Sequence, residues 1–239
     1  LLTGGLGAMA MALAQELVQA GARHLVLASR EGPQRLLRDA ACAGRVATWR
    51  ARGVAVDVLG LDVSRADAVA DCLAQLARDG RRLKGIVHAA GALDQAGLSE
   101  LGRDGAWGVG WRAKVDGARH LDRLSRAAAL DFFWLCSSVT ALWGMRTLAA
   151  YGAGNAFLDA IAAQRRAQGL AGLSLRLGRL EIAGLMSDSD AAVLDAIGIA
   201  PMRLPALMAG IRQAAGAADA VATLVSADWP RFVRHRREQ

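Results

Sequence analysis

The chain has 239 residues, of which 54% are apolar and 21% charged, and its formal net charge is +7 at pH 7. This length suits one α/β domain with a sizeable core. Charged residues interrupt every apolar run before it reaches membrane-spanning length, which excludes a transmembrane helix. The arginines are scattered, and one Tyr and four Phe offer little for base stacking. These features argue against nucleic-acid binding and favour an acidic protein or a phosphorylated ligand as the partner of a basic surface.

The cysteines and the first residues bear on the compartment and on the domain organisation. Cys42, Cys72 and Cys136 are too widely spaced for a zinc site or a disulfide framework, which favours a reducing, cytoplasmic compartment. The sequence opens on Leu1 without a Met or a signal peptide, and a glycine turn follows at once. We therefore expect a shortened first strand and a fragment of a larger multidomain polypeptide.

Short β-rich runs alternate with helical stretches along the chain. Strands are predicted over His24–Ala28, Val54–Leu61, Gly85–His88, Phe132–Cys136, Gly172–Leu177 and Val221–Val225. Helices are predicted over Ala8–Ala20, Gln34–Arg52, Arg65–Arg78, Leu98–Ala129, Tyr151–Gln168 and Leu204–Ala214. This alternation predicts an α/β fold, a Rossmann-type doubly wound parallel sheet flanked by helices, with residues 1–239 as one domain. Glu181–Pro201 breaks the alternation, and we expect it to form a mobile lid.

The glycine turn points to a dinucleotide. The residues are Thr3-Gly4-Gly5-Leu6-Gly7-Ala8-Met9-Ala10, in which Gly5, Gly7 and Ala10 satisfy the pattern G-x-G-x-x-G/A. Such glycines let backbone N–H groups approach a pyrophosphate at the start of a helix. A merely tight strand–helix turn is the alternative.

Residues after the next three strands fit the same ligand. Ser29-Arg30 stands where an NAD enzyme carries an acid for the ribose, and a guanidinium there favours the 2′-phosphate of NADPH. Asp62-Val63 ends another strand, where the acid either accepts from an adenine amino group or caps a helix. Ala89-Ala90-Gly91 either lets backbone lie against the cofactor or reflects close packing.

A serine and a tyrosine carry the chemistry. Ser138 ends a predicted strand and Tyr151 follows 13 residues later, which resembles the short-chain dehydrogenase/reductase superfamily. That resemblance implies that Tyr151 protonates the developing alkoxide while Ser138 polarises the carbonyl. A tyrosine with a pKa of about 10 needs a nearby cation for this work. The family's usual Lys four residues after the tyrosine is here Asn155.

The position of the lysine points to one group within this superfamily. Lys114 is one of two lysines in the chain, and Lys114 with Asn155 is similar to the ketoreductases of polyketide synthases and animal fatty acid synthases. Further matches cover almost the whole chain, at Gly21–Arg30, His88–Asp94, Asn155–Asp159 and Ala227–Phe232. The segment Leu177-Gly178-Arg179-Leu180 departs from the family's W-G-x-W, which puts the substrate-pocket floor and the cofactor amide contacts in doubt.

The resemblance implies NADPH-dependent reduction of a β-ketoacyl chain held as a thioester on the phosphopantetheine arm of an acyl carrier protein, without a metal. In this reading Lys114 lowers the pKa of Tyr151 and holds the cofactor ribose, and Asn155 orders a relay water or Lys114. An upstream structural subdomain and other synthase domains are the implied partners, with no nucleic acid and no membrane. The alternatives are a redox-inactive ketoreductase-like scaffold domain and, more remotely, a methyltransferase, which has no use for the Ser–Tyr pair.

The most detailed expectation concerns the configuration of the hydroxyl group in the product. In A-type ketoreductases, which give the L-hydroxy product, a Trp precedes the catalytic Tyr by eight residues, as Trp143 does here. Leu93-Asp94-Gln95 only partly matches the B-type Leu-Asp-Asp, and Leu148 replaces the usual Gln or His. We expect an A-type domain; the alternative is that Trp143 packs under the lid.

Overall fold

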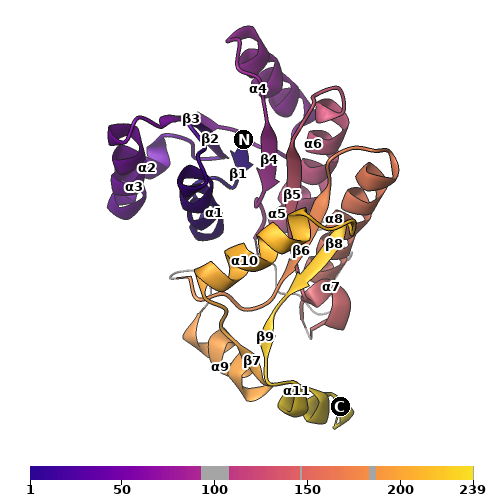
Figure 1. Cartoon of the computed structure of the whole chain (residues 1–239). Helices are drawn as coiled ribbons and strands as arrows, with labels where there is room; N and C mark the ends of the chain where they lie inside the picture. Colours follow the sequence, from indigo (N-terminus) through magenta and orange to yellow (C-terminus); the bar gives the residue numbers. More distant parts are fainter. Residues whose placement is uncertain (93–107, 146, 183–186, 239) are drawn as a thin grey trace.

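The computed structural model describes residues 1–92, 108–145, 147–182 and 187–238. A parallel sheet in the order β3-β2-β1-β4-β5-β6-β8 forms its centre (Figure 1). These strands are β1 (Leu2–Thr3), β2 (His24–Ser29), β3 (Ala55–Gly60), β4 (Gly85–His88), β5 (Phe132–Ser138), β6 (Leu173–Leu177) and β8 (Val221–Leu224). The order reverses between β1 and β4, and open α/β sheets bind ligands beyond the carboxyl ends of the strands at such a reversal. The predicted Rossmann-type doubly wound fold is confirmed.

Two helical layers cover the sheet. One apolar core joins it to α1 (Ala8–Gln19), α3 (Ala40–Ala51) and α10 (Leu204–Ala215). The other core joins its second face to α4 (Ala66–Arg78), α6 (Gly117–Ser125) and α8 (Ala149–Ala167). Strand β2 shows the underlying pattern, because Leu25 and Leu27 enter the first core while Val26 and Ala28 enter the second. Burial on both faces explains why central strands such as β2 and β4 read as continuous apolar runs.

The predicted helix Gln34–Arg52 is wrong in one respect. The chain forms α2 (Gln34–Arg38) and then α3, because Asp39 leaves the helical conformation. The Asp39 carboxylate accepts from the backbone N–H of Cys42 at 2.9 Å and so caps α3. An aspartate inside an apparently continuous helical pattern therefore marks a break.

The predicted helix Leu98–Ala129 is also divided, and its first part lies outside the described residues. Its described part consists of α5 (Val109–Trp111), the π-helical turn η1 (Arg112–Asp116) and α6, which ends at Ser125 rather than Ala129. π-helical turns are rare and often occur at functional sites. The turn here carries Lys114.

The predicted lid contains regular structure. Within Glu181–Pro201, residues 183–186 lie outside the described part, and helix α9 (Asp188–Ala196) follows. Ser187 caps α9 by accepting from the N–H of Asp190 at 3.1 Å. Strand β7 (Ile199–Ala200) pairs antiparallel with β9 (Ser226–Ala227), which leads into the terminal helix α11 (Trp229–Arg237). Five of the described elements are not among those predicted from the sequence: α9, β7, β9, α11 and the short helix α7 (Thr140–Trp143) after β5.

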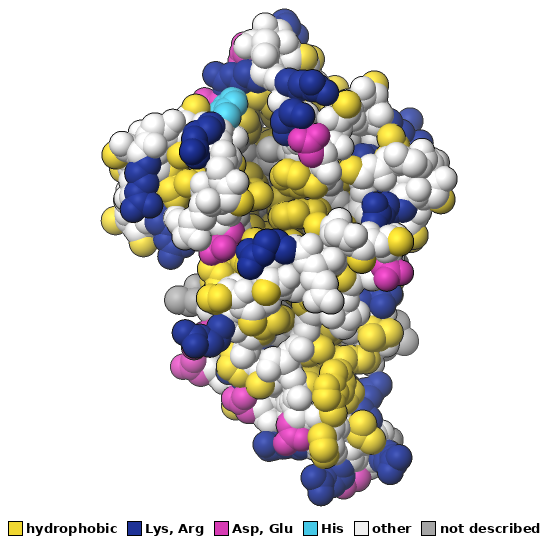
Figure 2. All heavy atoms as spheres, viewed as in Figure 1, with side chains coloured by type: hydrophobic (Ala, Val, Ile, Leu, Met, Phe, Trp, Pro, Cys, Tyr) yellow, Lys and Arg dark blue, Asp and Glu magenta, His cyan; other side chains and the backbone are white. Residues whose placement is uncertain are grey.

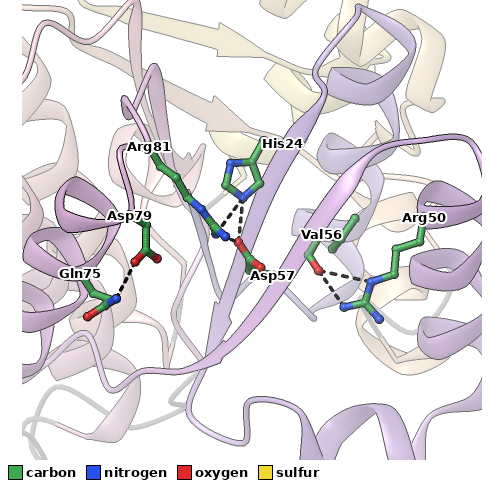
Figure 3. A network of polar contacts seen from close by, with 7 residues as sticks. All are labelled: His24, Arg50, Val56, Asp57, Gln75, Asp79 and Arg81. Carbon is green, nitrogen blue, oxygen red and sulfur yellow. Dashed lines mark hydrogen bonds and ion pairs between the residues drawn. The ribbon is translucent and has the colours of Figure 1, made fainter.

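The surface in Figure 2 carries Lys and Arg side chains scattered between apolar ones, rather than in one basic stripe. A polar network on β2 and β3 is drawn in Figure 3, where Asp57 contacts both His24, at 2.7 Å from its Nε2, and Arg81. His24 begins β2 and Arg30 follows its last residue, so this network lies at the opposite end of the strand from Arg30. Among the described helices, none is long and apolar enough to cross a membrane.

Candidate active site

The glycine turn leaves no room for side chains. Gly4 has a φ of +64°, and a Cβ on Gly4 would lie 2.8 Å from the carbonyl oxygen of Ala89. A Cβ on Gly5 would lie 2.6 Å from the carbonyl oxygen of Leu2. The chain thus passes from β1 to α1 within four residues, and Gly7 stands at the start of the helix without a side-chain cap. The N–H groups of the first helical turn face the end of the sheet where a pyrophosphate would lie.

The residues after β2 and β3 lie at the same edge. Arg30 is exposed directly after β2, and it forms no ion pair with the described residues. Ser29 Oγ accepts from the N–H of Gly32 at 3.1 Å. Asp62 accepts from the hydroxyl and the N–H of Ser64 at 2.7 and 3.0 Å, and these hydrogen bonds, with the nearby Arg30, lower the pKa of Asp62. Those contacts are the ones a turn cap makes, and contact of Asp62 with adenine stays a prediction.

The segment after β4 connects the turn to the candidate catalytic residues. The N–H of Ala89 donates to the carbonyl of Thr3 at 3.1 Å, and Ala89 and Ala90 are half-buried. A Cβ on Gly91 would lie 3.0 Å from Cε of Lys114. Glycine at this position lets the lysine side chain pass beside the backbone.

Ser138, Tyr151 and Asn155 meet where β5 ends and α8 begins. Burial raises the pKa of Tyr151, while hydrogen bonds with the side chains of Asn155 and Ser138 lower it. Asn155 is fully buried, and its Nδ2 donates to the carbonyl of Tyr151 at 2.8 Å. Its Oδ1 has no partner among the described residues. A buried acceptor without a donor is rare in folded proteins, and here it leaves Asn155 able to receive a water or an ammonium.

Lys114 reaches the same place from η1. Its Nζ donates to the carbonyl of Cys136 at 3.0 Å and lies 5.3 Å from the centre of the Tyr151 ring. Only 7% of Lys114 is exposed. The structure therefore brings Lys114 and Asn155 together beside Tyr151, although Lys114 precedes the tyrosine by 37 residues.

The charge states of Lys114 and Tyr151 differ from the expectation that Lys114 lowers the pKa of Tyr151. Burial lowers the pKa of Lys114 to about 8, against opposing contributions from Cys136 and Asp159. Lys114 therefore carries its charge at neutral pH but loses it before Tyr151, with its raised pKa, would ionise. In this state the side chains that lower the pKa of Tyr151 are those of Asn155 and Ser138, and Lys114 is not among them.

Helix α8 holds the tyrosine through contacts further along its length. Arg165 is 1% exposed, donates to Asp122 of α6 at 2.9 Å and stacks over the Phe133 ring at 4.0 Å. Asp159 accepts from Ser174 of β6 at 2.5 Å. A buried ion pair with satisfied partners fixes geometry more than it adds stability, and here it fixes α8 against α6.

A small cavity of about 10 Å³ lies directly beside Lys114 and Tyr151. Its walls comprise Ala92, Gly110, Trp111, Lys114, Ala150, Tyr151 and Gly154. A larger cavity of about 260 Å³ lies near the amino ends of β1, β2 and β4, away from the tyrosine. The small cavity has room for about one water molecule, and it marks the candidate site because Lys114 and Tyr151 line it.

The stereochemical residues are only partly described. Leu93, Asp94 and Gln95 lie outside the described residues. Leu148 is buried at the start of α8. Trp143 packs on the terminal helix α11, with ring centres 4.6 Å from Phe232 and 6.3 Å from Trp229.

The unusual Arg179 follows β6. Its Nη1 contacts Asp195 of α9 at 2.5 Å and the carbonyl of Ala191 at 3.3 Å. The residue that departs from the family pattern therefore anchors the helix of the predicted lid. Sequence reasoning gave Arg179 no partner, because the contact bridges two segments separated by a break in the helix–strand pattern.

A doubly wound parallel sheet with a glycine turn after β1 and a Ser–Tyr pair after β5 defines a Rossmann-type short-chain dehydrogenase/reductase fold. Residues 1–181 match the model of the KR domain family. Phenolphthiocerol synthesis polyketide synthase type I Pks15/1 of Mycobacterium bovis is 42% identical over 232 residues, 94% of this chain and 11% of that protein. Erythronolide synthase EryA3 of Saccharopolyspora erythraea is 34% identical over 233 residues, 97% of this chain and 7% of that protein.

Solved structures agree. PlmKR1, the ketoreductase from the first module of phoslactomycin biosynthesis in Streptomyces sp. HK803, has a TM-score of 0.89 at 30% identity, covering 98% of this chain and 53% of that one. This chain belongs to the KR domain family, the ketoreductases of modular type I polyketide synthases. It spans only a small part of the synthases it matches.

Proposed function

We propose that this chain reduces the β-keto group of an acyl thioester to a hydroxyl with NADPH. The observation that carries the proposal is that Lys114, Asn155 and Ser138 all lie against Tyr151, and that Lys114 and Tyr151 line one small cavity. The residues present fit the cofactor, because a Cβ on Gly4 or Gly5 would clash with backbone, and the exposed Arg30 forms no salt bridge among the described residues. We assign the pyrophosphate to Thr3–Gly7 and the 2′-phosphate to Ser29 and Arg30.

The cofactor, when bound, supplies the hydride that reduces the carbonyl carbon. Ser138 Oγ donates a hydrogen bond to the carbonyl oxygen and so polarises it. Tyr151 Oη gives its proton to that oxygen as the negative charge develops. Lys114, charged at neutral pH, stabilises the resulting tyrosinate, and Asn155 Oδ1 orders a water or the ammonium for reprotonation. Asp62, Val63 and Ala89–Gly91 are assigned to the walls of the cofactor groove.

We assign the acyl chain to the phosphopantetheine arm of an acyl carrier protein, with an upstream structural subdomain and other synthase domains as neighbours. The basic composition, at +7, suits an acidic carrier domain. Three free thiols suit a reducing, cytoplasmic compartment.

The alternative is a redox-inactive scaffold domain. In its favour, the word "inactive" stands in the name of a Mycobacterium tuberculosis polyketide synthase that is 43% identical over 232 residues. Against it, Tyr151, Ser138 and Lys114 are all present and adjacent.

One experiment separates the two functions. The chain is incubated with NADPH and a β-ketoacyl N-acetylcysteamine thioester, and the loss of NADPH absorbance is followed beside Tyr151→Phe. We expect consumption by the wild type and almost none by the variant. NADPH binding without consumption in the wild type establishes the scaffold, and consumption by both proteins removes Tyr151 from the reaction.

For stereochemistry we propose the A-type, L-hydroxy outcome on the strength of Trp143. Solved A1-type and C2-type ketoreductases match at 33% and 31% identity, so fold similarity does not distinguish the types. Chiral chromatography of the reduced thioester decides. A predominantly D-hydroxy product refutes the assignment to Trp143.

A further inference from the structure

His88 is the last residue of β4, and its imidazole joins two parts of the site that the sequence keeps far apart. It is 1% exposed. Its Nδ1 lies 2.7 Å from the hydroxyl of Thr3, and its Nε2 lies 3.0 Å from the backbone carbonyl oxygen of Lys114. One buried ring therefore spans from the first residue of the glycine turn to the candidate catalytic lysine.

The two contacts assign the roles of the ring nitrogens. Burial lowers the pKa of His88 to about 4, so the imidazole is neutral at physiological pH. The carbonyl of Lys114 can only accept, which places the single ring proton on Nε2. Nδ1 then accepts from the hydroxyl of Thr3. Both ring nitrogens are satisfied in one tautomer, and the bridge needs no water.

The surroundings are shaped to admit the ring. Gly117 follows η1, and a Cβ there would lie 2.9 Å from Cε1 of His88 and 2.8 Å from Cγ2 of Val63. Any other residue at 117 would push the helix away from the imidazole. The glycine thus lets the backbone of the π-helical turn come within hydrogen-bond distance of the ring.

The lysine side chain has little freedom of its own. Its Cδ lies 3.5 Å from where a Cβ on Gly154 would be, and its Nζ is bound to the carbonyl of Cys136. A shift of the Lys114 backbone therefore carries the ammonium away from Tyr151 instead of being absorbed by the side chain. Misplacement of a catalytic group by about 1 Å can cost about 100-fold in rate.

We propose that His88 is a positioning residue, whose neutral ring holds the π-helical turn so that Lys114 stays beside Tyr151 and links that lysine to the glycine turn through Thr3. The proposal rests on the proposed reductase function for its kinetic consequences. Its structural part stands on the contacts of His88 alone. Sequence patterns show His88 only as the first letter of a segment of small residues, and nothing in them indicates the bridge.

Three variants test the bridge. His88→Phe fills the space without either hydrogen bond, whereas His88→Gln offers one donor and one acceptor on its amide. His120→Phe is the matched control, because His120 also contacts a backbone carbonyl, that of Val63 at 3.1 Å, but does not touch Lys114. We expect His88→Phe to lower kcat by about 100-fold, His88→Gln to recover most of this loss, and His120→Phe to stay near wild type.

A double substitution separates positioning from general support of the fold. If His88 acts through Lys114, then adding His88→Phe to the Lys114→Met variant should lower kcat by less than about threefold. Losses that multiply overturn the proposal, as does a His88→Phe enzyme whose melting temperature falls while its kcat is unchanged. His88→Gln being no better than His88→Phe overturns it too.

Two measurements on the protein itself keep this test independent of turnover. Ring ¹⁵N shifts of wild-type His88 should report the neutral Nε2–H tautomer at neutral pH, and the other tautomer or a charged ring contradicts the bridge. Amide hydrogen exchange in Arg112–Gly117 should accelerate in His88→Phe but not in His120→Phe, and equal exchange contradicts it. If the wild type turns over no ketone, the proposed function fails while these two results still decide the bridge.

Discussion

Replacing Lys114 with Met tests the electrostatics of the site, because Met keeps most of the buried volume and removes the charge. The ammonium lies 5.3 Å from the Tyr151 ring centre. Taking the ring centre as the position of the tyrosinate charge, and an effective dielectric constant of about 20, the ammonium contributes roughly 3 kcal/mol, or about two pKa units, to a forming tyrosinate. We therefore expect Lys114→Met to lower kcat by about 100-fold at pH 7.

The pH profile gives the sign. Burial lowers the pKa of Lys114 from 10.5 to about 8, so the cation is present below pH 8 and is lost as the pH rises through it. Reduction by the wild type should therefore slow above about pH 8. In Lys114→Met that limb should vanish, and the remaining alkaline limb should follow Tyr151, whose pKa is raised above 10.0.

Initial rates of NADPH oxidation with a β-ketoacyl N-acetylcysteamine thioester, from acid to alkaline pH, measure both effects. Lys84→Met is the matched control, because Lys84 is the chain's other lysine and forms an exposed ion pair with Asp131 at 3.2 Å. Its loss should change the rate little. A Lys114→Met enzyme within threefold of wild type, with its alkaline limb still near pH 8, refutes the role given to the lysine.

Three further predictions concern other residues. Tyr151→Phe should lower the reduction rate more than about 100-fold while leaving NADPH affinity nearly intact, and a loss under tenfold counts against Tyr151 as the acid. Arg30→Ala should raise the KM for NADPH by about 10- to 100-fold and leave that for NADH nearly unchanged, and equal changes would remove Arg30 from the 2′-phosphate site. The pKa of His88 is lowered from 6.5 to about 4, so the unfolded chain binds the proton more tightly and stability should fall by about 3 kcal/mol as pH drops through that window. Urea denaturation at several pH values checks this, with His88→Gln, which lacks the titrating ring, showing less dependence on pH.

The regular part of the fold follows from sequence because each signal is local. Every buried strand is a short apolar run between polar turns, so the sheet and its doubly wound class could be read directly. The break at Asp39 could not be anticipated from periodicity, because its capping of α3 competes with a continuous helical pattern. The partner of Arg179 on α9 could not be anticipated either, since tertiary contact alone brings these segments together.

Some residues of the candidate site can likewise be located from the sequence, whereas others depend on tertiary packing. The glycine turn, Arg30, Ser138 and Tyr151 stand at strand ends or fixed spacings, and the sequence locates them. Lys114 needed the family resemblance, because its place beside Tyr151 depends on the packing of η1 against α8. The link from Thr3 through His88 to the Lys114 carbonyl could not be predicted from sequence. Both hydrogen bonds of His88 join residues far apart in the chain, and no sequence pattern distinguishes them from ordinary packing of a buried histidine.

Hydride transfer from the cofactor to the ketone is measured with NADPH deuterated at the transferable position of the nicotinamide. The chain is incubated with this cofactor and a β-ketoacyl N-acetylcysteamine thioester, and the product is analysed by mass spectrometry and NMR. We expect a β-hydroxy thioester with deuterium on its β-carbon, formed by the wild type and nearly absent with Tyr151→Phe. Unchanged ketone, or a hydroxy product without the label, contradicts this transfer.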